Sequence, residues 1–402
     1  MLKGRKILLG VTGGIAVYKA VLLLRELSRR GADVRVAMTE NACKFVAPLT
    51  FETLSGHPVY PDLFHLTEKA EIPHISLADF PELVVVAPAT ANIIGKIAGG
   101  IADDLLSTLV MATKAPVLLC PAMNVNMYEN RIVQKNLSDL ASLGYLIMAP
   151  GYGPLACRTE GQGRLPEPSD IAEEIEFILS TKDLVGECIV VTAGPTQEPL
   201  DPVRFISNYS SGKMGYALAS MARRRGAFVV LISGPTALPT PAGVEFVPVK
   251  TAIEMRDAVL AHFQKATVII KAAAVADYRP STYEPSKIKK KLGEMNIALA
   301  RNPDIISEIA AHKGDRVIVG FSMESDRLLE HAREKLVAKR MDFIVANDIT
   351  EAGAGFQRDT NIVRILAKDG TVEEYPLMKK LDVASVILDR IKMIREKGAG
   401  GR

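Results

Sequence analysis

Residues 187–216, ECIVVTAGPTQEPLDPVRFISNYSSGKMGY, decide the fold that this sequence predicts. The stretch begins with an apolar run at residues 188–192, typical of a buried strand, and from Met214 onward it has the composition and spacing of a helix. A loop rich in glycine and serine joins the two and carries Asn208 and Lys213. Strand, glycine-rich loop and helix form an anion site in α/β proteins, because free backbone N–H groups and the helix dipole point at the ligand.

The chain opens on the same plan. An apolar run at residues 6–9 leads into GVTGG at residues 10–14 and then into a helical pattern at residues 16–30. A second opening of this kind near the middle of 402 residues predicts two α/β domains in one polypeptide. We expect both domains to be doubly wound, with residues 1–183 in the first and residues 184–402 in the second.

Composition excludes several classes of protein. Hydrophobic residues make up 48% of the chain and charged residues 24%, as in ordinary globular domains. The net charge is +3 without a long block of one sign, which argues against a nucleic-acid partner. No apolar run is long enough to cross a bilayer, and the short one at the N-terminus leads into Gly13 and Gly14 rather than a cleavage site, so we expect a cytoplasmic protein. The four cysteines form no CxxC pair, which disfavours a disulfide framework and a thiolate zinc site.

A nicotinamide dinucleotide is disfavoured in both halves. The first glycine turn is GxxGG instead of GxGxxG, and the second strand, at residues 32–38, is followed by Thr39 instead of an acidic residue. The corresponding strand of the second half, at residues 228–233, also lacks an acid at its end. A hydroxyl at a strand end suits a phosphate or flavin mononucleotide (FMN) instead.

Three polar residues of the first half carry candidate chemistry. His74 lies in IPHISLAD, where a single histidine is most simply a strand-edge residue. Asn124 follows an apolar strand at residues 116–120, and open α/β sheets place ligands at the carboxyl ends of their strands. Cys157 lies in a glycine-rich segment that we expect to be a mobile flap rather than a regular element. The adjacent Asp103 and Asp104 are expected to have a capping or interface role rather than to bind one metal ion, because neighbours on a helix point about 100° apart.

These motifs, His74 in PHI, PAMNVNM around Asn124 and Cys157 in ACRTEGQGR, together resemble the flavin-dependent cysteine decarboxylase family. The resemblance implies a flavoprotein fold that forms trimers with FMN between subunits. It also implies that His74 acts as a base in substrate oxidation, that Asn124 grips the carboxylate beside Met127, and that Cys157 donates a proton. Residues expected at the FMN are Gly13, Gly14, Ile15, Thr39, Ala89, Thr90 and Ala91.

The sequence departs from that family at three positions. Tyr128 stands where tryptophan is usual, and Arg158 and Thr159 stand where bacterial bifunctional members tend to have glycine and aspartate. These departures affect the expected packing of the flap and the fit of the substrate, and they remove none of the catalytic groups.

The second half contains basic and acidic residues near predicted strand ends. Asp277 follows an apolar strand at residues 267–271, and Lys287 begins the run KIKKK. Such a run is usually only a solvated face, but next to Asp277 and the serine–glycine–lysine loop it favours a polyphosphate lid. Lys335 and Lys339 are one helical turn apart and can contact one phosphate chain, although an exposed charged face explains them equally well. Asn302 is expected to cap the next helix.

The motifs SNYSSGKMG, AAAVADYRP, KIKKK, RNPDI, VGFS and VANDI resemble the phosphopantothenate–cysteine ligase family in the same order. Its bacterial and archaeal members are fused behind a decarboxylase and use CTP. The resemblance therefore implies a Rossmann-like domain that ligates cysteine to 4′-phosphopantothenate through an acyl-cytidylate with Mg²⁺, followed by decarboxylation to 4′-phosphopantetheine in the other domain. Asn208 is expected to act on the acyl-cytidylate. Residues expected to hold the substrate or nucleotide are Ser211, Gly212, Lys213, Ala272, Ala273, Asp277, Lys287, Asn302, Pro303, Asp304, Ile305, Phe321, Lys335 and Lys339.

Several questions stay open at this point. No residue distinguishes CTP from ATP, and no metal ligands are indicated. The resemblance implies dimer contacts in the second domain and trimer contacts in the first, and hence a homo-oligomer. A flavin prenyltransferase-like first domain would not need the combination of His74, Asn124 and Cys157. A non-catalytic flavin or nucleotide module would be expected to lack catalytic residues, and a nicotinamide reductase is least favoured.

Overall fold

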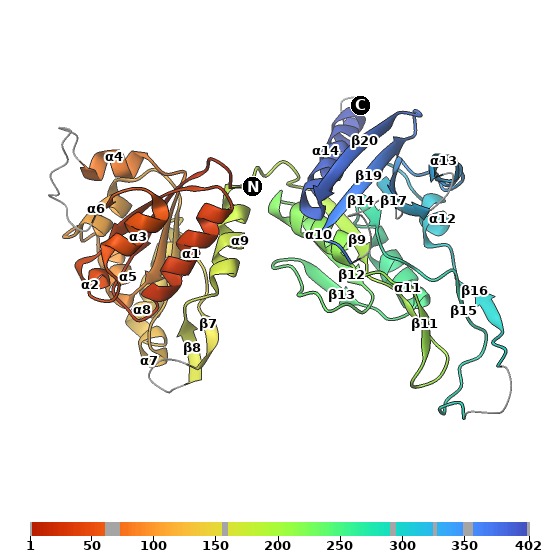
Figure 1. Ribbon diagram of the computed structural model, residues 1–402, viewed down its shortest axis with the longest axis horizontal. Coiled ribbons are helices and arrows are strands. Elements are labelled where there is room, and N and C mark those ends of the chain that lie inside the picture. The colour runs from red at the N-terminus through yellow and green to blue at the C-terminus, as the bar shows by residue number, and fades with distance from the viewer. Residues whose placement is uncertain are drawn as a thin grey trace. The chain divides into compact units, whose positions relative to one another are not determined.

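The computed structural model describes residues 2–60, 73–154, 160–289, 295–324, 328–348 and 357–399. The chain divides into two compact units, Met1–Ser180 and Thr181–Arg402 (Figure 1). Residues 181–183, expected at the end of the first domain, belong to the second unit. The ammonium of Lys182 donates to the carbonyl of Arg224 at 2.7 Å, and Asp183 forms an ion pair with Arg225 at 2.7 Å.

The first unit is built on a parallel sheet of six strands in the order β3-β2-β1-β4-β5-β6. The chain turns to opposite sides after β1 and after β3, so the carboxyl ends of β1 and β4 border the crevice where such sheets bind ligands. Every residue of β4 is buried, as expected of a strand covered on both faces. The strands are β1 (Lys6–Val11), β2 (Asp33–Met38), β3 (Val59–Tyr60), β4 (Leu83–Ala89), β5 (Val117–Pro121) and β6 (Leu146–Ile147).

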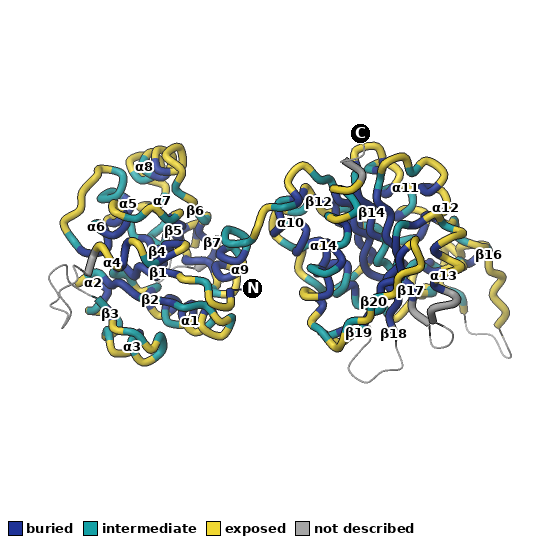
Figure 2. The backbone as a smooth tube through the Cα atoms, turned by 90° about the horizontal axis from the view of Figure 1, so that it is seen from above, coloured by how far each residue is buried: buried dark blue, intermediate teal, exposed yellow. Residues whose placement is uncertain are grey.

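Helices cover both faces of this sheet, whose strands are largely buried (Figure 2). A separate hydrophobic cluster packs against each face. One face carries α1 (Val17–Arg29), α2 (Glu40–Cys43), α3 (Pro48–Ser55) and α9 (Pro168–Leu179). The opposite face carries α4 (Pro73–Asp79), α5 (Ala91–Ala98), α6 (Leu105–Ala112) and α8 (Arg131–Ser142). The short α7 (Val125–Tyr128) follows β5. The doubly wound prediction is confirmed for this unit.

Local details of the first unit differ from the sequence-based expectations in two places. His74 is the second residue of the helix α4 and does not lie at a strand edge. The glycine-rich segment contains two antiparallel strands, β7 (Gly151–Pro154) and β8 (Glu160–Arg164), so the expectation that it has no regular element was wrong. Its mobility stays a prediction, and residues 155–159 lie outside the described residues. Asp104 caps α6, one of the two roles expected for this acidic pair: its carboxylate accepts from the Ser107 N–H at 2.8 Å. Asp103 instead forms an ion pair with Lys96 at 2.6 Å.

The second unit has a sheet of eight strands in the order β13-β12-β9-β14-β17-β18-β19-β20, parallel as far as β18 and antiparallel beyond it. The sequence did not predict β20, because most of its residues are exposed or half-buried and its apolar pattern is weak. The strands are β9 (Cys188–Ala193), β12 (Phe228–Ser233), β13 (Glu245–Pro248), β14 (Val268–Lys271), β17 (Val317–Glu324), β18 (Phe343–Asp348), β19 (Thr360–Ala367) and β20 (Val372–Lys379).

Two helices cover one face of this sheet and three cover the other. The first group is α10 (Lys213–Arg224) and α14 (Lys380–Ala399). The second is α11 (Ala252–Phe263), α12 (Ile305–Ala310) and α13 (Leu328–Ala338). The cap of α12 is Asp304, whose carboxylate accepts from the Ser307 N–H at 3.3 Å, so the cap expected at Asn302 was wrong.

Two small ribbons project from the second unit (Figure 1). They are β10 (Gln197–Pro199) with β11 (Phe205–Ser207), and β15 (Tyr278–Pro280) with β16 (Leu299–Arg301). Sequence patterns did not predict them, because three-residue strands carry too little periodicity. No helix within the described ranges is long and apolar enough to span a lipid bilayer.

Candidate active sites of the two units

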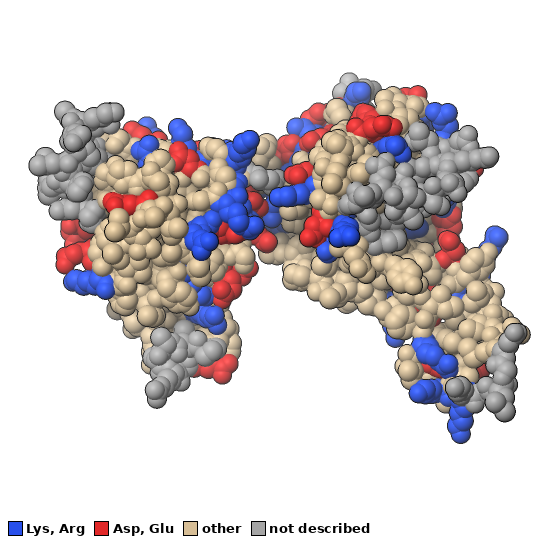
Figure 3. Space-filling model, viewed as in Figure 1, with Lys and Arg blue, Asp and Glu red and all other residues tan. Residues whose placement is uncertain are grey.

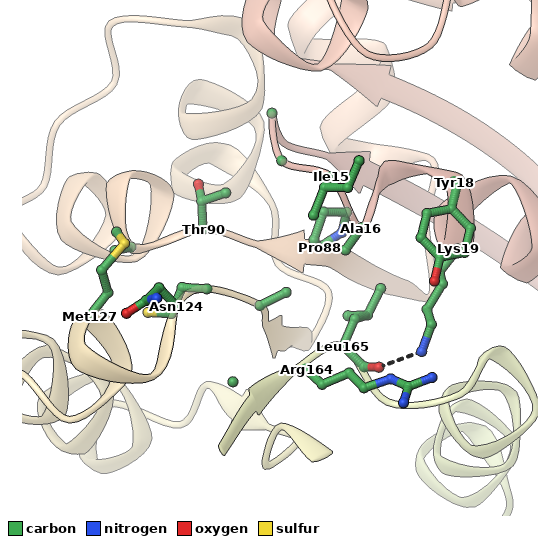
Figure 4. Close-up of a pocket in the computed structure, with 16 residues that line it drawn as sticks. Ile15, Ala16, Tyr18, Lys19, Pro88, Thr90, Asn124, Met127, Arg164 and Leu165 are labelled. Carbon is green, nitrogen blue, oxygen red and sulfur yellow. Dashed lines mark hydrogen bonds between the residues drawn. The ribbon is translucent and has the colours of Figure 1, made fainter. Parts of the chain in front are cut away.

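A cavity of about 620 Å³ opens at the carboxyl ends of β1 and β4 in the first unit (Figure 4). Asn124 and Met127 lie side by side at one end of it, and Lys19 lies at the other. Of the residues expected at the FMN, five line this cavity: Gly13, Gly14, Ile15, Thr90 and Ala91. The expected catalytic Asn124 lines it as well.

Two expected FMN residues are not among the residues that line the cavity. Ala89 is fully buried in the core beneath α5, and its carbonyl already accepts from the Ala122 N–H at 3.0 Å. Thr39 caps α2, with its hydroxyl accepting from the Ala42 N–H at 3.3 Å. The side chain of His74 and the whole of Cys157, Arg158 and Thr159 lie outside the described residues.

The two loops that border the cavity are bonded to each other. The buried hydroxyl of Thr12 donates to the carbonyl of Pro88 at 2.6 Å and accepts from the Thr90 N–H at 3.2 Å. Thr90 in turn caps α5 through the Ile93 N–H. These bonds hold the ends of β1 and β4 at a fixed separation, so a ligand between the loops meets a preformed wall.

The adjacent glycines of the first loop serve different purposes. A Cβ at Gly13 would lie 2.5 Å from the Cβ of Asn41, so the fold itself requires glycine there. A Cβ at Gly14 would have the Thr90 methyl, at 3.7 Å, as its nearest neighbour. Gly14 therefore has room within the protein, and a side chain there would occupy cavity space that a flat ring or phosphate needs. The start of α1 follows directly, with the Val17 N–H donating to the Gly14 carbonyl.

The β7–β8 hairpin closes the Asn124 side of the cavity. The Met123 N–H donates to the Gly163 carbonyl at 3.0 Å, and a Cβ at Gly163 would lie 2.3 Å from the Met123 carbonyl oxygen. A Cβ at Gly161 would lie 2.7 Å from Val125. Both glycines of the GQG motif thus allow β8 to pack directly on the segment that carries Asn124, whose own Oδ1 accepts from the Asn126 N–H at 2.8 Å.

Lys19 is a cavity residue that the sequence analysis missed. Its ammonium is buried and donates to the Leu165 carbonyl and to the Glu167 carboxylate, both at 2.9 Å. It thereby ties α1 to the chain that leaves the hairpin. The sequence does indicate that Lys19 is unusual. It lies four residues before the buried Leu23, on the face of α1 that packs on the core, where an apolar residue is normal.

In the second unit several of the expected residues lie at the carboxyl ends of three adjacent strands, β9, β14 and β17, whereas Lys287 lies on the segment between β15 and β16 and Lys335 lies in α13. The loop after β9 is bonded to the loop after β14: the Ala274 N–H donates to the Gly194 carbonyl at 2.9 Å. The side-chain amide of Asn208 donates to the Ala274 carbonyl at 3.1 Å. Asn208, Ala272 and Ala273 therefore lie in one neighbourhood.

The start of α10 forms a second part of this site. Gly212, the cap residue, has a φ of +78°, a conformation that glycine adopts without strain. The Lys213 ammonium is held by the Asp359 carboxylate at 2.6 Å and by the Gln357 carbonyl at 2.9 Å. The buried Lys380 lies next to this pair, and burial together with the charge of Lys213 lowers the pKa of Lys380 to about 8. No sequence motif indicated a role for Lys380.

Positive charge collects on the α12 and α13 side of the sheet. Lys339 forms an ion pair with Asp304 at 3.0 Å. Burial and the positive charges of Lys339 and Lys335 lower the pKa of Lys271. Lys335, Lys339, Asp304 and Asp277 are thus the charged neighbours that act on Lys271. The sequence-based prediction of the site did not include Lys271. A lysine between the apolar run VII and the motif AAAVAD could have indicated it.

The structure also describes three further residues that were expected at the nucleotide. The Asn302 side chain donates to the Ala276 carbonyl at 2.8 Å, and its N–H donates to the Asp277 carbonyl at 2.8 Å, so Asn302 joins the loop after β14 to the start of α12. Phe321 lies in β17, next to β14. Lys287 is exposed on the segment between β15 and β16. Among the described residues, no group of three or more His, Cys, Asp or Glu side chains is placed to hold a metal ion.

Comparisons with known proteins agree with this two-part architecture. Residues 1–180 match the Flavoprotein family, and residues 184–394 match the family described as DNA/pantothenate metabolism flavoprotein C-terminal domain. The coenzyme A biosynthesis bifunctional protein CoaBC of Bacillus subtilis (strain 168) is 50% identical over 401 residues, 99% of each chain. The CoaBC protein of Escherichia coli (strain K12) is 47% identical over 395 residues, 97% of each chain. A crystal structure of the C-terminal domain of CoaBC is 43% identical, with a TM-score of 0.48, and covers 54% of this chain and 100% of that chain.

The fold and the two sites define a flavoprotein-type unit joined to a unit of pantothenate metabolism. The chain belongs to the family of coenzyme A biosynthesis bifunctional proteins, and it is an enzyme with phosphopantothenoylcysteine decarboxylase and phosphopantothenate–cysteine ligase activities. The family expected from the motifs is confirmed.

Proposed function

We propose that the second unit joins cysteine to 4′-phosphopantothenate with CTP and Mg²⁺, and that the first unit decarboxylates the product with FMN. One observation carries this assignment: in each unit the motif residues gather where a glycine loop and a helix start meet the carboxyl ends of neighbouring strands. Both places have the geometry of a phosphate site. We further propose that the enzyme works in the cytoplasm.

In the first unit, Gly13, Gly14, Ile15, Thr90 and Ala91 would hold FMN. The open space at the Gly14 Cα and the start of α1 fit a flat ring with a phosphate. When bound, FMN supplies the two-electron chemistry that makes the bond to the substrate carboxylate labile.

The chain's own groups then have distinct tasks in the decarboxylation. Asn124 holds the carboxylate that is lost, because its amide is fixed by its bond to the Asn126 N–H and faces the cavity beside Met127. His74 takes a proton from the substrate, and Cys157 returns one at the end of the reaction. The β7–β8 hairpin excludes water from the Asn124 side while these protons move.

In the second unit, Lys271, Lys335 and Lys339 neutralise the triphosphate of the nucleotide. Mg²⁺ would be held chiefly by phosphate oxygens, with the carboxylates of Asp277 and Asp304 near, which is the usual way that proteins bind this ion with a nucleotide. The carboxylate of 4′-phosphopantothenate attacks the α-phosphorus and pyrophosphate leaves. The amine of cysteine then attacks the acyl carbon and CMP leaves, with Asn208 placed to orient the acyl-cytidylate.

Exposed apolar side chains support the proposed homo-oligomer. Ile15, just before α1, and Tyr18, in α1, line the cavity and are also 63% and 53% exposed, and Leu22 in α1 is 47% exposed. A partner subunit over this part of α1 would bury them and close the open side of the FMN site. We propose trimer contacts here and dimer contacts in the second unit, to be measured by light scattering of the whole chain.

The proposed ligase is tested by the order of product release. Pyrophosphate should appear when CTP, 4′-phosphopantothenate and Mg²⁺ are mixed before cysteine is added, and the Asn208→Ala variant should accumulate the acyl-cytidylate. Tyr209→Phe is the matched control, because Tyr209 is the next residue and is 88% exposed. Pyrophosphate release that requires cysteine, or normal ligation by Asn208→Ala, would remove these roles. The first unit is tested by colour, since a colourless purified protein that still decarboxylates would contradict the FMN assignment.

A further inference from the structure

Asp201 and Arg204 form a compact ion pair at the turn of the β10–β11 hairpin. The Asp201 side chain is fully buried, and it accepts from the backbone N–H groups of Val203 and Arg204, both at 2.8 Å. The guanidinium of Arg204 donates to the same carboxylate from Nε at 3.0 Å and from Nη2 at 2.6 Å. The pair is therefore held in one geometry by the hairpin itself.

This pair also holds a residue from a distant part of the chain. The Ile288 N–H donates to the Asp201 carboxylate at 3.1 Å, and the Ile288 carbonyl accepts from Arg204 Nη2 at 3.1 Å. The Glu284 N–H donates to the Leu200 carbonyl at 3.0 Å. Because both polar backbone groups of Ile288 are bound, the backbone at this residue is held against the turn of the hairpin.

The residues on either side of Ile288 are Lys287 and Lys289, and both are exposed. Lys287 is one of the residues that the resemblance to the ligase family places at the substrate or nucleotide. Basic side chains gather on the end of the projecting ribbons (Figure 3). The Asp201–Arg204 pair thus anchors the segment that presents these charges.

The other end of the same hairpin is fixed at the reaction centre. The Ser207 hydroxyl donates to the Thr196 carbonyl at 2.8 Å, and Asn208 directly after it is bonded to Ala274. The buried Glu198 accepts from the Ala252 N–H at 2.9 Å at the start of α11. One short hairpin therefore connects the loop of Asn208 at its base to the segment of Lys287 at its turn.

We propose that Asp201 and Arg204 are positioning residues of the ligase, which hold Ile288 so that Lys287 is set at a defined place relative to the loop of Asn208 and to the nucleotide phosphates. The proposal rests on the proposed function of the second unit. Arginine suits this task because one planar guanidinium donates to a carboxylate and to a carbonyl at once, whereas lysine offers a single point charge. The Arg204 guanidinium also holds the pKa of Asp201 well below its usual range, so the pair stays ionised at neutral pH.

The test compares Arg204→Met and Arg204→Lys with the wild-type full-length enzyme. Pyrophosphate release is measured against CTP concentration. Its rate at saturating CTP and the Tm report that the second unit is folded, and decarboxylation by the same samples reports that the first unit is intact. We expect the KM for CTP to rise about tenfold in both variants, as expected from the loss of a charge-assisted hydrogen bond, with decarboxylation unchanged. The matched control is Arg364→Met, which removes another arginine of the same unit, paired with Glu374 at 2.9 Å. An unchanged KM for CTP in Arg204→Met, or full rescue by Arg204→Lys, overturns the proposal.

A double-mutant cycle with Lys287→Met separates positioning from a purely structural role. If the pair acts through Lys287, Arg204→Met adds little to the KM of Lys287→Met, because the two changes remove the same contact with the nucleotide. Effects that multiply, or a fall in Tm with an unchanged KM, show that the pair only stabilises the hairpin and overturn the proposal. An unchanged KM in Lys287→Met alone would overturn the nucleotide role of Lys287 and the positioning role together. If Lys287→Met raises the KM for CTP and Arg204→Met does not, only the positioning role of Arg204 is overturned.

Discussion

Thr12 and Thr90 are bonded across the ends of two neighbouring strands: the Thr90 N–H donates to the Thr12 hydroxyl at 3.2 Å, and that hydroxyl donates onward to the Pro88 carbonyl at 2.6 Å. Thr12 is buried, so this bond is shielded from water. The two loops that face the cavity are therefore held together, and the FMN site proposed for the first unit depends on this contact.

Replacing Thr12 with valine should weaken FMN binding. The valine keeps the shape but leaves the buried Pro88 carbonyl without its donor, at a cost of about 1–3 kcal/mol. The measurement is the flavin absorbance per chain after dialysis, and Thr12→Ser, which keeps the hydroxyl, is the control. Equal flavin content in the valine and serine variants would show that the loops do not need this bond.

The adjacent glycines of the first loop should respond differently to alanine. Gly14→Ala has space within the protein, so we expect a normal Tm and reduced FMN retention, because the new methyl group enters the cavity. Gly13→Ala would place a Cβ 2.5 Å from the Cβ of Asn41, so we expect a lower Tm of the first unit. Thermal unfolding and flavin absorbance are measured on both variants. The same response in both would contradict the separate roles of the two glycines.

Packing of the hairpin on the Asn124 segment should be essential for decarboxylation. Gly161→Ala would place a Cβ 2.7 Å from the Val125 side chain and push β8 away. We expect the decarboxylase kcat to fall while pyrophosphate release by the ligase stays normal. Val125→Ala in the same chain removes the opposing methyl groups, so the double variant should recover activity. If the single variant is fully active, or the double variant is not rescued, this contact does not position Asn124.

The buried Lys380 should give the protein a distinctive pH dependence of stability. Burial, then the charge of Lys213, lowers its pKa from 10.5 to about 8, so the folded state disfavours the charged form. The cost, on the order of 2 kcal/mol, is present in full below pH 8 and fades as the pH rises toward 10.5. Between these values the wild type should therefore gain stability relative to Lys380→Met. Urea unfolding across this range measures the gain, with the exposed Lys379→Met as control, and parallel pH profiles for wild type and Lys380→Met would contradict it.

Elements whose signals are local could be predicted from the sequence. The strand at residues 228–233 was predicted with the bounds of β12, because a strand buried on both faces is a continuous apolar run between turns. A capping role was one of the two expected for Asp104, since a capping carboxylate and the N–H it accepts from are only three residues apart. The motifs around Asn124 and Asn208 pointed to the right family for the same reason, because each is a short run of adjacent residues.

The sequence by itself thus determined the two α/β units, most of their strands and the family to which the chain belongs. Only the tertiary structure decided that Lys19 is fixed by Leu165, that Lys271 shares a site with Lys339, and that Arg204 holds Ile288. The β7–β8 hairpin and β20 also emerged only from their partners across the sheet. The physical reason is that local patterns record the preferences of neighbouring residues, whereas these contacts join residues that are distant in the chain and meet only when the whole sheet has formed.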